Sequence, residues 1–242
     1  MGFINIWNKL HLLRKKGIIL FFLFVFILNH AFAQKYQEIN LPNSDNHKLH
    51  YGFVIGGHVS KYKLKYNKIF IQDDSIHALK PLNSGGFSIG FLVNKRLGDY
   101  FDLRVLPTAG FYENTIKYMY ANSANNISKT VEVTYLEIPL LLKYKSERRK
   151  NFRMYLVGGI KPAFEVTNKK DDEREHLNID KTNMSVEYGV GVDIYYPMFK
   201  FSPELRFSQG VVDMLSPSGS VYNRPIDVLR THSVSLYLIF GS

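Results

Sequence analysis

The sequence contains no cysteine. This absence excludes disulfides, a lipid-acceptor cysteine behind an export signal, cysteine-ligated zinc and a cysteine nucleophile. Beyond the first thirty residues the chain also lacks any apolar run long enough for a membrane helix. Without such a helix, only a closed β-barrel satisfies its backbone hydrogen bonds inside a membrane. The sequence therefore leaves a β-barrel as the one structure by which it can span a bilayer.

The N-terminus has the pattern of an export signal. Lys9 and the run Arg14 to Lys16 precede an uncharged apolar stretch over residues 17–28, and Ala31-Phe32-Ala33 follows. We predict that residues 1–33 are a cleaved signal peptide and that the mature chain begins at Gln34. An uncleaved anchor helix is the alternative, but a twelve-residue apolar stretch rises only about 18 Å against roughly 30 Å of hydrocarbon. Cleavage lowers the formal charge from +10 to +6.

Eight later segments alternate apolar and polar residues. In residues 183–194, for example, Val186, Tyr188 and Val190 alternate with Glu187 and Gly189. Side chains of a strand alternate faces at period two, so each segment has one apolar face and one polar or small face. The segments are residues 49–61, 87–94, 101–112, 136–144, 153–165, 183–194, 199–208 and 232–240.

The connections between these segments alternate between long and short. The long ones, residues 64–83, 121–130, 167–181 and 212–228, are polar and include the charge run 169–175, which is typical of a solvated loop. Outer-membrane barrels have short periplasmic turns and long extracellular loops. The sequence therefore predicts an all-β, eight-stranded antiparallel up-and-down transmembrane β-barrel over residues 48–242, with both termini periplasmic. Residues 34–47 are then a periplasmic N-terminal segment.

Charged residues on the polar faces indicate which face points inward. Six acidic and six basic residues occupy those faces, and this balance indicates a neutral network inside a narrow lumen rather than a solvated outer surface. We predict that ten of them form the network: Asp102, Arg104, Glu137, Lys143, Lys161, Glu187, Asp193, Lys200, Glu204 and Arg206. The other two are Glu165 and Arg153.

The short turns predict a register. Turns at residues 196–197, near Arg149 and at Gly98 set opposite charges and polar groups across from each other. A slip of two residues keeps every face but changes every partner. The predicted cross-strand pairs are Glu187–Arg206, Asp193–Lys200, Glu137–Lys161 and Asn94–Asp102.

Two further features concern the strands. Four prolines lie inside assigned strands, where each removes a backbone donor, so we expect local bulges there; they are Pro107, Pro139, Pro162 and Pro203. Aromatic residues near the strand ends predict interfacial girdles. They are Tyr100, Phe101, Tyr144, Phe152, Tyr196 and Phe199 toward the turns, and Tyr112, Tyr118 and Tyr120 toward the loops.

Four stretches resemble a known family. The run of residues 135–144, YLEIPLLLKY, resembles a strand of a large outer-membrane β-barrel family. Together with residues 98–107 (GDYFDLRVLP), 188–193 (YGVGVD) and 200–208 (KFSPELRFS), it looks like the PorT family, also called SprT in gliding bacteria. The resemblance covers residues 50–240 and implies an outer-membrane barrel required for type IX secretion, which exports folded cargo and supports gliding. It implies no catalytic residues and no cofactor.

Other chemistry has weaker signals. His58 and Ser60 share a polar face near the loop side, but no acid can be placed beside them as a catalytic triad would need. A polar pair at the lumen mouth is the simpler interpretation. Glu175 and His176 lack the spacing of a metal site, and the chain has no basic helix or aromatic platform for nucleic acid.

The leading hypothesis is a non-enzymatic accessory protein of type IX secretion with a side-chain-filled lumen, because eight strands enclose too little space for a cargo channel. Its outer wall, its loops or residues 34–47 are expected to contact other secretion components. Outer-membrane lipid and lipopolysaccharide are the other expected partners. Two alternatives stay open: a lipid A-modifying barrel enzyme, and a structural or adhesion barrel whose loops bind external ligands.

Overall fold

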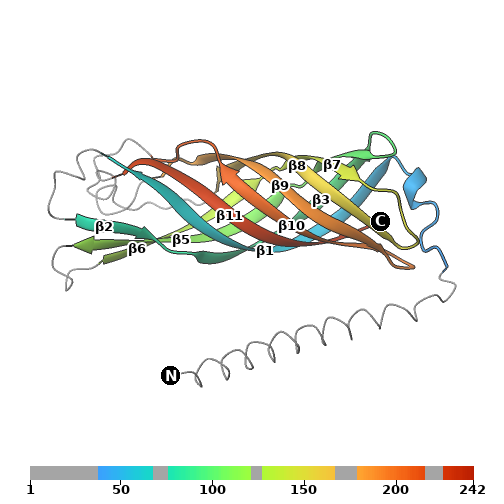
Figure 1. Cartoon of the computed structure of the whole chain (residues 1–242), viewed down its shortest axis with the longest axis horizontal. Helices are drawn as coiled ribbons and strands as arrows, with labels where there is room; N and C mark the ends of the chain where they lie inside the picture. Colours follow the sequence, from blue (N-terminus) through green and yellow to red (C-terminus); the bar gives the residue numbers. More distant parts are fainter. Residues whose placement is uncertain (1–37, 68–75, 121–126, 167–178, 216–225) are drawn as a thin grey trace, which may run out of the picture. The chain divides into compact units, whose positions relative to one another are not determined.

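The computed structural model describes residues 38–67, 76–120, 127–166, 179–215 and 226–242, and the predicted signal peptide lies outside them. None of the described residues forms a helix that is long and apolar enough to cross a membrane. The described elements (Figure 1) are the 3-10 helix η1 (Ser44–Asn46) and the strands β1 (Leu49–Tyr66), β2 (Ile76–Pro81), β3 (Ser84–Arg96), β4 (Phe101–Val105), β5 (Thr108–Tyr120), β6 (Ile127–Glu137), β7 (Leu140–Lys145), β8 (Phe152–Glu165), β9 (Thr182–Tyr195), β10 (Lys200–Gly210) and β11 (Ile226–Gly241).

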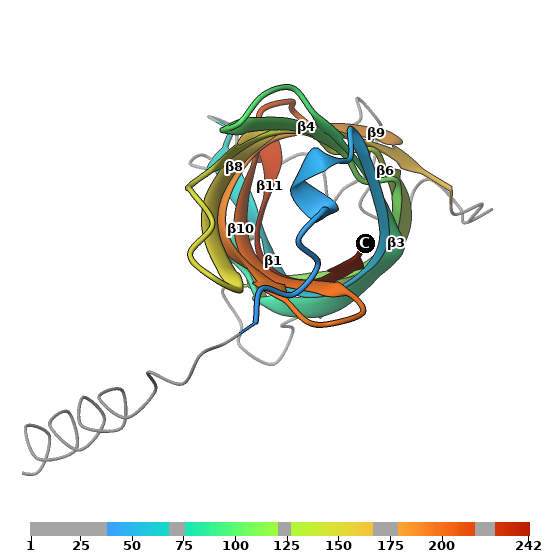
Figure 2. The ribbon, with the colours of Figure 1, turned by 90° about the vertical axis from the view of Figure 1, so that its right-hand side faces the viewer.

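These strands form eight barrel strands, because three barrel strands are each interrupted once. β2 and β3 belong to one barrel strand, β4 and β5 to the next, and β6 and β7 to the third. All pairings are antiparallel and follow chain order, and β11 pairs with β1 to close the ring seen end-on in Figure 2. The predicted eight-stranded up-and-down barrel is confirmed.

The prolines account for two of the interruptions. Strand geometry is lost at residues 106–107 and 138–139, which include Pro107 and Pro139. In each case the same barrel strand then continues. Pro162 and Pro203 lie within the continuous strands β8 and β10. The β9–β10 ladder nevertheless has no pairs between Phe201–Ile194 and Glu204–Gly191, the stretch that contains Pro203. Each proline removes a ladder donor without ending its barrel strand.

An apolar belt surrounds the middle of the barrel. Its side chains point outward, as shown by the exposed fractions of Phe53 (49%), Phe91 (70%), Met154 (68%) and Leu236 (52%). The intervening residues of the same strands point inward and are buried. Apolar side chains are stable on an outer surface only where that surface meets lipid, so this belt is the membrane-spanning zone.

Toward the loop end the two faces exchange character. On β1, Val59 is the last outward apolar residue of the alternation, and Lys61 and Lys63 continue the outward face. The inward Tyr62 between them is 2% exposed. Within the belt, the outward side chains of β1 are therefore apolar. Beyond the belt, its outward side chains are polar and its inward side chains are apolar. This reversal marks the loop-side boundary of the hydrocarbon zone.

The strands are longer at the loop end than the alternation predicted. β1 continues to Tyr66, β5 reaches Tyr120, and β6 and β11 begin at Ile127 and Ile226. The predicted loops 64–83, 121–130 and 212–228 are therefore too long. Beyond the belt the outward residues are polar, so a search for apolar outward faces misses this part of the strands.

All three predicted registers are wrong by two residues, although every residue keeps its predicted face. Lys200 lies opposite Tyr195 instead of Asp193. Glu137 lies opposite Ala163, and Asn94 opposite Arg104. Each turn is centred one residue later than predicted: four residues, 196–199, connect β9 to β10, and Lys150 in the β7–β8 turn has a φ of 56°.

The aromatic girdle is correct at the turn end and partly wrong at the loop end. The Phe101 and Tyr144 rings contact each other at a tilt, with ring centroids 5.2 Å apart, and both rings are exposed. At the loop end, by contrast, Tyr112 and Tyr118 point inward and are buried. They belong to the inward face of β5, so the loop-side girdle consists of other residues: Phe87, Phe111, Tyr188 and Phe207, all exposed.

Candidate functional site: a charged barrel interior

A chain of alternating charges crosses the barrel interior. Lys161 Nζ lies 3.0 Å from Glu137 Oε1 and 3.2 Å from Glu187 Oε1. Arg206 Nη1 lies 3.4 Å from Glu187 Oε2, and Arg206 also bonds Glu204. Arg104 Nη1 ends the chain, 2.5 Å from Glu204 Oε2. Their side chains are at most 4% exposed, so each charge depends on its neighbours for stabilisation.

Two further ion pairs lie nearer the turn end. Lys143 on β7 reaches over β8 to Asp193 on β9, with Nζ 2.6 Å from Oδ2. The Ser202 hydroxyl donates to the other oxygen of Asp193 at 2.7 Å. Lys145 Nζ lies 2.6 Å from Asp102 Oδ1. Lys143–Asp193 and Arg104–Glu204 join barrel strands that are not neighbours in the ring, so these two pairs brace the barrel in cross-section.

The structure places all ten predicted network residues in the buried interior, and nine of them make ion pairs. Lys200 is also buried, but within the described part of the chain no carboxylate lies within ion-pair distance of it. Arg153 pairs outside the network, and Glu165 is only half-buried. The sequence reasoning missed Lys145, which follows Lys143 by two residues and therefore shares its face. The buried set consequently has five acidic and six basic residues instead of six of each.

Two tyrosines fill the space between the charges. Lys143 Nζ lies 3.8 Å from the centroid of the Tyr155 ring, and Arg206 Cζ lies 4.3 Å from that of Tyr237. Each ring lies against a glycine, since a Cβ on Gly191 would be 2.4 Å from Tyr155 and one on Gly56 would be 2.5 Å from Tyr237. These glycines give the rings room, and the rings stabilise the cations through their π faces.

An apolar core fills the loop end of the interior. It contains Tyr62, Leu79, Ile116, Tyr118, Ile226 and Leu229, all at most 3% exposed. A second apolar group, which includes Tyr135 and Met214, adjoins the charge network. Beyond the belt, the barrel is therefore packed like a soluble protein.

The N-terminal segment covers the turn end of the interior. In Figure 2, η1 lies within the ring of strands at the short turns. Its Asp45 accepts a hydrogen bond from Arg153 Nη1 at 2.7 Å and lies 3.7 Å from Arg148 Nη1. Arg96 donates to the Asp45 carbonyl oxygen. We call Asp45 and these three arginines the latch.

Other bonds hold the start of this segment. The Asn40 amide donates to Asn151 Oδ1 at 2.9 Å, and the Asn40 side chain donates to the Tyr195 carbonyl at 2.9 Å. Arg148 donates to the carbonyls of Asn40 and Leu41 and stacks over the Tyr195 ring. The described part of the predicted periplasmic segment is thus bound to the barrel rim.

The latch lowers the pKa of Asp45. Burial alone would raise the pKa of this carboxyl, but the hydrogen bond and charge of Arg153, with the charges of Arg148 and Lys145, hold it below its ordinary value. Asp45 therefore stays ionised and paired at every physiological pH.

His58 and Ser60 do not form a dyad. Ser60 donates to Asn114 Oδ1 at 2.8 Å, and His58 Nδ1 lies 3.3 Å from Ser88 Oγ. The His58 ring stacks on Tyr112 at 4.0 Å, and both His58 and Ser60 are buried. Neither side chain has the access to lipid that an acyl-transfer nucleophile or base requires.

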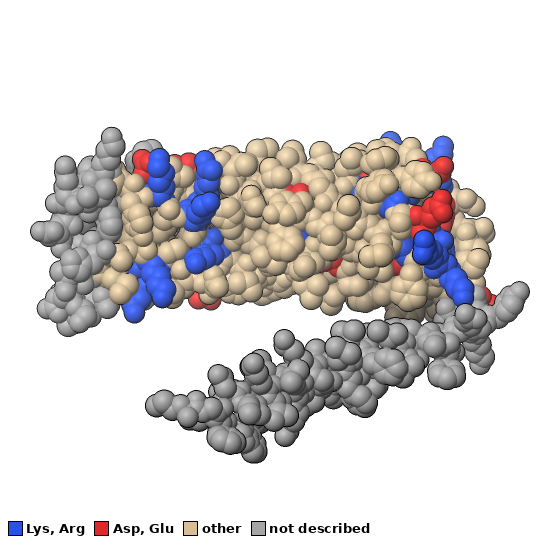
Figure 3. Space-filling model, in the orientation of Figure 1, with Lys and Arg blue, Asp and Glu red and all other residues tan. Residues whose placement is uncertain are grey.

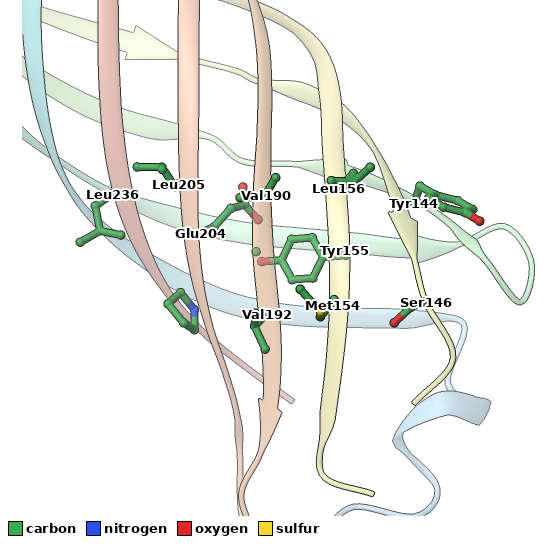
Figure 4. A pocket seen from close by; sticks show the side chains of 12 residues that line it. Tyr144, Ser146, Met154, Tyr155, Leu156, Val190, Val192, Glu204, Leu205 and Leu236 are labelled. Atoms are coloured by element: carbon green, nitrogen blue, oxygen red, sulfur yellow. The ribbon is translucent and has the colours of Figure 1, made fainter. Parts of the chain in front are cut away.

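The outer wall has a shallow apolar hollow where Pro203 interrupts the β9–β10 ladder (Figure 4). Outward side chains from five strands line it, among them Tyr144, Met154, Val190, Leu205 and Leu236. Tyr155 and Glu204 lie at its inner side. The hollow faces the lipid zone and contains no group of polar side chains on its outer side.

One family model and several solved structures are similar to this chain. The sequence profile of the outer membrane protein beta-barrel domain matches residues 32–216. No curated protein sequence matches the chain. Similar solved structures include Neisserial surface protein A (12% identity, TM-score 0.43, covering 78% of this chain and 95% of that one). OprG from Pseudomonas aeruginosa is also similar (13% identity, TM-score 0.43, covering 81% of this chain and 96% of that one). AlkL is similar as well (13% identity, TM-score 0.41, covering 86% of this chain and 92% of that one).

Proposed function

Because the chain belongs to the outer membrane protein beta-barrel domain family, we propose that it is a non-enzymatic accessory component of type IX protein secretion and gliding motility. The observation that carries the proposal is the filled interior: ion pairs and tyrosines in the middle, an apolar core at the loop end and the latched segment at the turn end. A barrel filled in this way is a rigid membrane scaffold and not a conduit.

The resemblance to the PorT family supports the secretion role. Its matching stretches fall on β4, β6, β7, β9 and β10, and they contain eight of the ten predicted network residues. The exceptions are Lys161 and Glu187. The stretches that resemble the family thus contribute most of the interior charges of this chain.

A filled barrel acts through its surfaces. In this proposal its outer wall and loops bind other secretion components, while cargo passes elsewhere. The described part of residues 34–47 is bound at the rim, which leaves the outer wall and the loops as the main contact surfaces.

The test is deletion of the gene in its own host, followed by assays of secreted proteins and of colony spreading. We expect both to fail and to be restored by the intact gene. Restoration by a variant with shortened loops would assign the contacts with secretion components to the outer wall and would exclude an adhesion barrel, which needs its loops. Normal secretion and spreading in the deletion strain would contradict the proposal. Lipid A from a His58→Ala strain, measured by mass spectrometry, should be unchanged, whereas an altered lipid A would favour an enzyme.

A further inference from the structure

Basic side chains form an arc around the loop end of the barrel. Figure 3 shows Lys and Arg gathered there, separated from the turn end by a zone almost free of charge. The arc follows adjacent barrel strands in the order β11, β1, β2 and β5. We call these residues the basic collar: Lys61, Lys63, Lys65, Lys80, Lys117 and Arg230.

The collar contains two pairs of like charges in directly opposed positions. Lys63 lies opposite Arg230 across the β1–β11 ladder, and Lys80 lies opposite Lys117 across the β2–β5 ladder. Like charges opposed in this way destabilise a sheet. Within the described part of the chain, only Lys65 of the collar has an ion-pair partner, Asp227 at 3.1 Å. The collar is therefore more stable when an anion from outside the chain lies against it.

The two pairs belong to one continuous surface. The Tyr66 hydroxyl of β1 donates to the Leu79 carbonyl of β2 at 3.0 Å, and this bond bridges the two neighbouring barrel strands at this level. On the β5–β6 side the arc ends at Glu113 and Glu132, which oppose each other on the outer face and are exposed. The positive surface therefore spans four barrel strands and stops at an acidic boundary.

The level of the collar indicates where its anion comes from. Val59 of β1 and Val234 of β11 are outward residues of the apolar belt. Lys61 and Lys63 are the next two residues on the outward face of β1 after Val59, and Arg230 lies four residues from Val234 toward the loop end of β11. The collar thus borders the hydrocarbon zone, at the depth of lipid headgroups in the outer leaflet. Lysine is a compact point charge suited to phosphate, and an arc that follows the bilayer surface matches a row of headgroups better than a single soluble ligand.

We propose that the basic collar binds the phosphate groups of phosphorylated glycolipid headgroups in the outer leaflet. This binding offsets the repulsion within Lys63–Arg230 and Lys80–Lys117 and fixes the depth of the barrel in the membrane. The proposal depends on the barrel and its membrane zone, and it is independent of the secretion role.

The test measures lipid A binding to the full protein, purified from outer membranes in a zwitterionic detergent, by native mass spectrometry. Bisphosphorylated lipid A is titrated against the parent protein and the double variants K63Q/R230Q and K80Q/K117Q. The control is K48Q/K95Q, which removes two exposed lysines at the turn end. We expect each collar variant to bind about tenfold more weakly, because every basic residue near an anionic headgroup contributes several-fold to affinity. The control should bind like the parent.

Two further arms identify the ligand. Lipid A without its phosphates should bind the parent about as weakly as phosphorylated lipid A binds the collar variants. Inorganic phosphate at millimolar concentration should not displace lipid A. Equal binding by the collar variants, equal binding of the dephosphorylated lipid, or displacement by free phosphate would each overturn the proposal. The heat-dependent gel shift of a folded barrel shows that every variant compared is folded.

Discussion

Asp45 in the N-terminal segment accepts a hydrogen bond of 2.7 Å from Arg153 at the start of β8, 108 residues later in the chain. This bond connects the N-terminal segment, in which apolar and polar residues do not alternate, to the rim of a barrel whose strands alternate apolar and polar residues. Arg148, in the turn that precedes β8, and Arg96, at the β3–β4 turn, bind the same segment, so two of the turn-side connections hold one short stretch. The turn end of the interior is therefore covered by a part of the chain that the barrel itself keeps in place.

Breaking the latch should release the segment. In Asp45→Asn the hydrogen bond to Arg153 weakens and the charge is lost, so we expect the docked segment to lose about 1 kcal/mol for this partly exposed pair. The chain has no cysteine, so a single Asn43→Cys substitution carries a spin label at a unique, exposed position. Electron paramagnetic resonance should show a more mobile label in Asp45→Asn. Glu147→Gln, which removes an exposed acid at the same end whose carboxylate accepts from the Tyr100 hydroxyl, is the control and should leave the label unchanged.

The same label tests the pH dependence of docking. The pKa of Asp45 is lower in the folded protein than in the unfolded chain, so its stabilisation is complete above its unfolded pKa of about 3.9 and is lost as the pH falls through the lower folded value. The label should therefore stay immobile from neutral pH down to about 4 and loosen below that. In Asp45→Asn the same scan should show no acid transition. Loosening between pH 5 and 7 would point to a different titrating group.

The period-two alternation predicted the eight strands, their order and both faces because the direction of a side chain is a local consequence of strand geometry. It predicted the partners only in part: Glu137–Lys161 and Glu187–Arg206 form ion pairs, although neither pair lies directly opposite in a ladder, and the other contacts were not predicted. Arg104 meets Glu204 across the lumen, and Lys143 meets Asp193 over an intervening strand. Such contacts depend on the shear of the closed barrel and on turn shape, for example the left-handed backbone at Lys150, and neither is written in the pattern.

The latch was beyond sequence reasoning for another reason. Its segment has no periodicity, and Asp45, Arg96 and Arg148 lie in stretches that resemble ordinary polar turns. Only the closed ring brings them together. Lys145, by contrast, had a local signal, because it lies two residues after Lys143 and so on the same inward face.

Two adjacent glycines on β1 test how tightly the interior is packed. Gly56 faces inward, and a Cβ there would lie 2.5 Å from Cδ1 of Tyr237. We expect Gly56→Ala to destabilise the barrel by about 1–3 kcal/mol, the usual range for overpacking. Gly57→Ala is the matched control, since a Cβ at Gly57 has no atom within 4 Å. Urea titrations followed by the gel shift of the folded form should separate the two, and Tyr237→Leu should partly rescue Gly56→Ala. Equal urea midpoints for the two alanine variants would contradict the packing described for Tyr237.

Glu187 tests the charge network most directly, because its two oxygens lie near two different cations, Lys161 at 3.2 Å and Arg206 at 3.4 Å. In Glu187→Ala, Lys161 keeps its partner Glu137 and Arg206 keeps its partner Glu204. The two cations, however, lose the carboxylate that lies between them. Removing one partner from a buried ion pair costs about 3–5 kcal/mol, and the remaining acids should keep the loss near the lower figure. The urea midpoint of the folded, heat-modifiable band should fall accordingly. Glu132→Gln, which removes an exposed acid opposed to Glu113, should leave the midpoint unchanged or raise it slightly, since it relieves a like-charge pair. If Glu187→Ala unfolds at the same urea concentration as Glu132→Gln, the network does not hold the barrel together.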